Sequence, residues 1–181
     1  MSRNTTMGRI LAFAPRLLHG YPSTAAALEP AETLLLLATR GWVEDARRAA
    51  DPWPRLGAMA AAAGLPPAAA SLDMLLRVIA RTARRPLAIG CPGCPGLGPD
   101  EQRLLHAARL AQGRETGLAR QVLREGWLSD QGARFAIGPL QGLGDLFLAA
   151  GFVLRPRLLP DRMAPEDGAA APWPAAHPPR H

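Results

Sequence analysis

Lysine is absent from this sequence, and several other polar residues are rare. All 21 basic residues are arginine, asparagine occurs only at Asn4, tyrosine occurs only at Tyr21, and there are four serines. No Gly-x-Ser-x-Gly, His-Glu-x-x-His or phosphate-binding-loop pattern is present. With so little material for an active site, an enzyme is the least favoured class. The leading hypothesis is a non-catalytic interaction or regulatory module that binds another protein or a second copy of itself.

Cysteine and long apolar runs are also scarce. Two cysteines are too few for the disulfide framework of a small secreted domain, which favours the reducing cytoplasm. The apolar run at residues 10–14 is cut short by Pro15 and Arg16, and is therefore shorter than the apolar region of a secretory signal. No run is long enough to span a membrane. We therefore expect a soluble, cytoplasmic protein that does not insert into membranes.

The residues that are abundant favour helices. The chain is 48% hydrophobic but only 5% aromatic, so its core must be aliphatic, and β-branched residues that favour strands are few. The sequence predicts an all-α fold, an irregular bundle of six or seven short helices within one domain at residues 29–156. We expect a loosely ordered basic arm at residues 1–28 and a disordered tail rich in proline and alanine at residues 157–181.

Proline and glycine signals predict where the helices begin and end. Pro30 begins the first and Gly41 stops it, while Gly64 stops a later one and Pro139 breaks or kinks the last. The predicted helices cover residues 30–40, 43–50, 52–63, 66–85, 99–111, 114–126 and 130–151.

Helical spacing of apolar residues identifies the faces that should be buried. The most convincing face is Leu72, Leu75, Leu76 and Ile79. Two further faces are Leu34, Leu37 and Ala38 in the first helix, and Leu140, Leu143, Phe147 and Ala150 in the last.

The only chemically distinctive motif is Cys91-Pro92-Gly93-Cys94-Pro95, where a turn can bring two sulfur atoms together. The first interpretation is a rigid turn whose cysteines are small buried residues with free thiols. A second is a zinc site, which resembles half of a zinc knuckle but lacks the second cysteine pair. A third is thiol redox chemistry, which the prolines disfavour because they prevent a helix from starting at Cys91.

A zinc site would need ligands beyond Cys91 and Cys94. His106 could supply a third, although Gln102 and Arg109 on the same side of its helix predict a solvated face. Two turns in a homodimer could instead supply four thiolates. No other metal or cofactor is expected.

The net charge of +6 permits nucleic-acid binding without requiring it. The arginines Arg77, Arg81, Arg84 and Arg85 lie along one face and at the end of a predicted helix. They are the candidate nucleic-acid site, but a solvated face explains them better.

Two remaining features have ordinary explanations. Asp100 and Glu101 place negative charge at a helix start, which argues against phosphate binding there. The glycines at Gly142 and Gly144 follow no strand, so close helix packing explains them better than a dinucleotide site.

Overall fold

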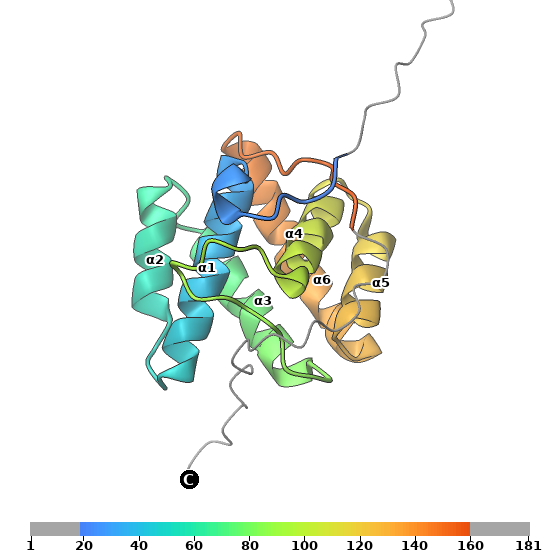
Figure 1. Cartoon of the computed structure of the whole chain (residues 1–181), viewed down its shortest axis with the longest axis horizontal. Helices are drawn as coiled ribbons and strands as arrows, with labels where there is room; N and C mark the ends of the chain where they lie inside the picture. The colour runs from blue at the N-terminus through green and yellow to red at the C-terminus, as the bar shows by residue number, and fades with distance from the viewer. Residues whose placement is uncertain (1–18, 160–181) are drawn as a thin grey trace, which may run out of the picture.

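Helices account for all of the regular secondary structure in residues 19–159, the part of the chain that the computed structural model describes (Figure 1). A single 3-10 turn, Ala25–Ala27, precedes them. The six α-helices are α1 (Pro30–Arg47), α2 (Trp53–Ala62), α3 (Ala68–Thr82), α4 (Pro99–Gln112), α5 (Thr116–Gly126) and α6 (Asp130–Ala149). This confirms the predicted all-α bundle. None of these helices is long and apolar enough to cross a membrane.

The helix starts follow the sequence signals closely. Pro30 and Pro99 occupy the first position of α1 and α4, where a missing backbone N–H costs nothing. The Ser129 hydroxyl caps α6 by accepting the N–H of Gly132 at 3.0 Å. Gly64 ends the turn after α2 with a φ of 70°, a backbone conformation that suits glycine.

The core forms where α3 packs against α6 and where α4 packs against both α5 and α6. Leu72, Leu75, Leu76 and Ile79 are all buried, as predicted. Gly144 lets α6 approach α4, because a Cβ there would lie 2.9 Å from the Cα of Gln112. The interpretation of the α6 glycines as packing positions is therefore confirmed at Gly144.

Three local predictions were wrong. Gly41 does not stop a helix: α1 continues to Arg47, and the missing Cβ makes room for the Arg55 side chain of α2. The buried face of α1 includes Leu35 and Leu36, whereas Leu37 is exposed.

The third concerns α6, in which the predicted break at Pro139 does not occur, since the helix runs through this residue. A proline inside a helix removes one backbone hydrogen bond, but the buried residues on either side, Ala136 and Leu140, keep this helix against the core. At its end, Ala150 is exposed rather than buried.

The first and last described segments lie together. Gly20 pairs with Leu158 in a parallel bridge, and the Leu158 N–H donates to the His19 carbonyl at 3.0 Å. The nearby Arg157 guanidinium binds both carboxylate oxygens of the buried Glu32, at 2.6 and 2.7 Å. Residues 19–28 and 157–159 thus pack on the helices. The rest of the predicted arm and tail lies outside the described residues.

Candidate functional site

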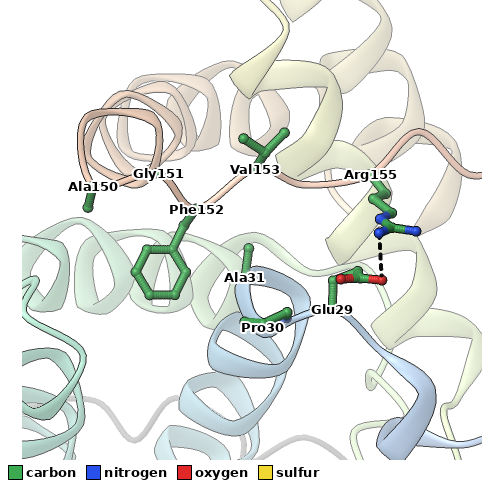
Figure 2. A pocket seen from close by; sticks show the side chains of 8 residues that line it. All are labelled: Glu29, Pro30, Ala31, Ala150, Gly151, Phe152, Val153 and Arg155. Atoms are coloured by element: carbon green, nitrogen blue, oxygen red, sulfur yellow. Dashed lines mark ion pairs between the residues drawn. The ribbon is translucent and has the colours of Figure 1, made fainter.

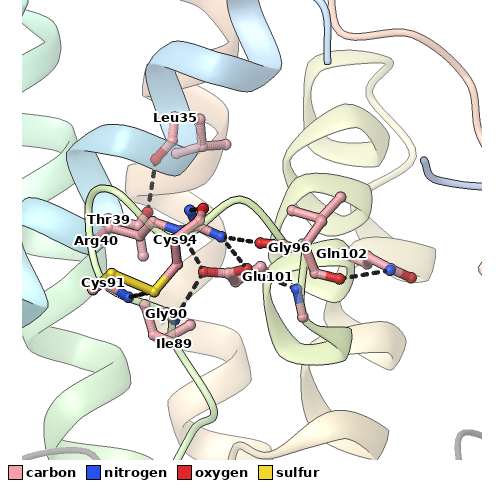
Figure 3. Close-up of polar contacts among 12 residues, drawn as sticks. Leu35, Thr39, Arg40, Ile89, Gly90, Cys91, Cys94, Gly96, Glu101 and Gln102 are labelled. Atoms are coloured by element: carbon pink, nitrogen blue, oxygen red, sulfur yellow. Dashed lines mark hydrogen bonds and ion pairs between the residues drawn. A yellow bond between two sulfur atoms is a disulfide. The ribbon is translucent and has the colours of Figure 1, made fainter. Parts of the chain in front are cut away.

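The two cysteines lie in the connection at residues 83–98, which joins α3 to α4 and passes over α1 (Figure 1). The Cys94 N–H donates to the Cys91 carbonyl at 3.0 Å, which closes the turn and brings the two Cα atoms to 5.1 Å. That separation suits a disulfide, and the structure links the two sulfur atoms (Figure 3). We call residues 91–94 the cysteine turn.

The expectation of free, buried thiols was therefore wrong. Both cysteines are in the disulfide, Cys91 is exposed and Cys94 is half-buried. The reason is the compact turn, which brings the two cysteine side chains next to each other. The absence of a helix at Cys91 was predicted correctly, since α4 begins only at Pro99.

A fully buried ion pair lies beneath the cysteine turn (Figure 3). Arg40 of α1 and Glu101 of α4 are each about 1% exposed, and their closest atoms, Nε and Oε1, are 2.7 Å apart. A second hydrogen bond joins Nη2 to Oε2 at 2.8 Å. This two-point pairing is the geometry in which an arginine binds a carboxylate most strongly.

The same two side chains hold the backbone on both sides of the cysteine turn. Arg40 donates from Nη1 to the Cys94 carbonyl and from Nη2 to the Gly96 carbonyl, both at 2.6 Å. Glu101 accepts the backbone N–H of Gly90 at 3.0 Å and of Gly98 at 2.8 Å. A connection rich in proline and glycine thus receives polar partners that it could not obtain from regular secondary structure.

Asp100 fixes the earlier part of the same connection. Its carboxylate binds the Arg85 guanidinium at 2.6 and 2.8 Å and accepts the Ala88 N–H at 2.8 Å. Asp100 and Glu101 do begin α4, as predicted, but both side chains are about 1% exposed and also organise the site. Sequence reasoning missed Arg40, because its partner Glu101 is 61 residues away and no local pattern connects them.

His106 is not placed as a metal ligand. No group of three or more His, Cys, Asp or Glu side chains suited to a metal occurs within residues 19–159. The predicted solvated face was also wrong, since Gln102 is buried and the Nδ1 of His106 is buried without a partner. Burial lowers the pKa of His106, and the positive charge of Arg109 lowers it further.

The four candidate nucleic-acid residues have different surroundings. Arg77 binds Asp73 at 2.7 Å, Arg85 binds Asp100, and Arg84 donates to the Arg124 carbonyl. Hydrogen bonding to the carboxylates raises the pKa of Arg77 and Arg85. Two of the four charges are thus already paired, while Arg81 stays exposed on α3.

A cavity of about 510 Å³ lies apart from the cysteine turn, between the start of α1 and the segment after α6 (Figure 2). Pro30, Phe152 and Val153 give it apolar walls, and Glu29 forms an ion pair with Arg155 at 3.1 Å on its edge. Glu29 and Arg155 are the only charged side chains that line the cavity, and their opposite charges neutralise each other. None of the candidate site residues predicted from the sequence, namely Cys91, Cys94, His106 and the four arginines, lines this cavity.

Comparisons with protein families, with characterised proteins and with solved structures find no match to this chain.

Proposed function

We propose that the protein is a redox-responsive interaction module whose cysteine turn exchanges a disulfide with the thiols of a partner protein. In this exchange a partner dithiol is oxidised to a disulfide while the Cys91–Cys94 disulfide is reduced to two thiols, or the reverse. The observation that carries the proposal is an exposed disulfide on a connection that two buried charged residues hold in place.

The disulfide contributes little that the fold needs. It closes a loop of only four residues, which in the chain-entropy model stabilises by about 2 kcal/mol, against about 4.7 kcal/mol for a loop of 100 residues. Arg40 and Glu101 make their contacts with the connection through the backbone of other residues as well as Cys94. The helices and most of the connection should therefore persist when the disulfide is reduced.

Exchange also requires access to a sulfur atom, and the exposure of Cys91 supplies it. A partner protein is favoured because no residue of the connection lines the cavity described above, so a small substrate bound in that cavity would not contact the disulfide. In the cytoplasm, the location we predict, reducing thiols would keep the turn reduced until an oxidised partner arrives.

Zinc is the alternative chemistry for the same two cysteines. A structural zinc ion normally takes four ligands, and one turn supplies two. Zinc would therefore require two chains, which a homodimer could provide.

The test is a redox titration of the full chain in mixtures of reduced and oxidised glutathione, read by thiol count and circular dichroism. We expect two thiols per chain to appear and disappear reversibly while the helical signal stays unchanged. The double variant Cys91→Ser/Cys94→Ser is the control and should show no such transition. Failure to form the disulfide, unfolding on reduction, or half an equivalent of zinc in a dimer that the control loses would each refute the proposal.

A further inference from the structure

We propose that the two sulfur atoms have fixed and different roles: Cys91 forms the mixed disulfide with the partner, whereas Cys94 is the leaving sulfur when the turn is reduced and the resolving thiol when the turn is oxidised. This inference rests on the proposed exchange function and adds the direction of attack. It follows from three asymmetries of the cysteine turn, in exposure, in anchoring and in hydrogen bonding to sulfur.

The first asymmetry is access. Cys91 is exposed and Cys94 is half-buried. An attacking thiolate must approach a disulfide along the line of the two sulfur atoms, from the side opposite the leaving sulfur. Because Cys91 is the more exposed of the two residues, attack at Cys91 should be less hindered than attack at Cys94.

The second asymmetry is anchoring. The Cys94 carbonyl binds the buried Arg40, and the next carbonyl, that of Pro95, accepts the Ala25 N–H at 2.8 Å. Within the described residues, Cys91 makes hydrogen bonds only to Cys94. When the disulfide opens, Cys91 can therefore move outward with an attached partner while Cys94 keeps its place.

The third asymmetry is the hydrogen bond to sulfur. The Cys91 N–H donates to the Sγ of Cys94 at 3.1 Å (Figure 3). A backbone N–H that already points at a sulfur stabilises negative charge there, and a stabilised thiolate is the better leaving group. The structure gives the Sγ of Cys91 no corresponding donor among the described residues.

The reaction then proceeds in two balanced steps. The partner thiolate bonds to the Sγ of Cys91, the Cys91–Cys94 bond breaks, and its electron pair goes to the Sγ of Cys94. The partner's second thiolate next attacks the partner sulfur of the mixed disulfide, which releases Cys91 as a thiolate that takes a proton from water. The partner dithiol has lost two electrons and the cysteine turn has gained them. The reverse sequence oxidises the turn.

The decisive experiment adds reduced glutathione to the oxidised full chain, stops the reaction with acid at short times, and locates the glutathione by fragment mass spectrometry. We expect at least about a tenfold excess of glutathione on Cys91 over Cys94. Equal labelling, or an excess on Cys94, would overturn the inference.

The two single variants provide a matched second measurement. In Cys91→Ser, residue 91 keeps its backbone N–H toward the remaining sulfur, whereas Cys94→Ser leaves Cys91 without a donor. The acid dissociation constant of the thiol, followed by thiolate absorbance, should be about tenfold larger in Cys91→Ser than in Cys94→Ser. Equal acid dissociation constants in the two variants, or a larger constant in Cys94→Ser, would refute the assignment of the leaving sulfur.

These outcomes are separable from failure of the proposed function. A disulfide that glutathione reduces reversibly but at Cys94 refutes only the assigned roles. A disulfide that no thiol reduces in the folded protein refutes the exchange function as a whole.

Discussion

Glu101→Gln tests whether the buried ion pair organises the cysteine turn. The substitution preserves the size of the side chain but leaves the buried Arg40 guanidinium without its counter-charge. It also places an amide NH₂ where a carboxylate oxygen now accepts the N–H of Gly90 or Gly98. Removing one member of a buried ion pair costs about 3–5 kcal/mol, so we expect a loss of that size in the free energy of unfolding.

Guanidinium chloride titration followed by circular dichroism measures this loss. For a chain of this length, 3–5 kcal/mol corresponds to a fall in Tm of roughly 6–20 °C. The matched control is Arg134→Gln, which breaks an exposed pair whose arginine and aspartate are 64% and 48% exposed. That control should cost about 0–1 kcal/mol. If Glu101→Gln costs no more than the control, the structural role assigned to the pair is wrong.

The double variant Arg40→Leu/Glu101→Gln isolates the interaction between the two charges. With the guanidinium absent, Glu101→Gln no longer strands a buried charge, so its additional cost should fall well below its cost in the parent. If the losses in the free energy of unfolding caused by the two substitutions simply add in the double variant, the two side chains act independently. Each titration is made on both the oxidised and the reduced protein, so that the contribution of the disulfide is measured separately.

Three further predictions concern other parts of the molecule. Gly144→Ala should destabilise the fold by about 1–3 kcal/mol through overpacking, whereas Gly138→Ala in the same helix, with open space around it, should be neutral or stabilising in the same titration. Because burial lowers the pKa of His106 below 6.5, the unfolded chain binds the proton first, so the free energy of unfolding should fall as the pH drops below about 6.5. His106→Gln should flatten that profile, and an unchanged profile would contradict the assignment. The double variant Arg77→Ala/Arg81→Ala should leave nucleic-acid binding and its salt dependence unchanged, and tight binding at physiological salt that this variant loses would contradict us.

Much of the fold could be predicted because its signals are local. Pro30 and Pro99 begin helices, Gly64 ends a turn, and Leu72 and Ile79 follow the helical period into the core. The errors occurred where tertiary packing outweighed a local signal. Gly41 leaves room for the Arg55 side chain of α2 instead of stopping its helix, and buried neighbours keep α6 continuous through Pro139.

The site was only half predictable for the same reason. The cysteine spacing identified Cys91 and Cys94, but the disulfide depends on how the turn closes. The Arg40–Glu101 pair is a contact between two helices, made by residues 61 positions apart in the sequence, and nothing in the residues around Arg40 indicates its partner. The sequence explained Asp100 and Glu101 by their place at a helix start, and it gave no sign that both carboxylates also accept backbone N–H groups of the connection.

The parallel pairing of Gly20 with Leu158 determines how the domain would respond to mechanical force. In a parallel pair, residues 19 and 159 lie at opposite ends of the paired segments, so a pull that separates these two residues slides the segments along each other. The backbone bond between Leu158 and His19 and the Arg157–Glu32 pair are then loaded together in shear, rather than peeled open one after another. The contacts of residues 19 and 20 with residue 158, together with the Arg157–Glu32 pair, thus resist extension before any helix is pulled from the bundle.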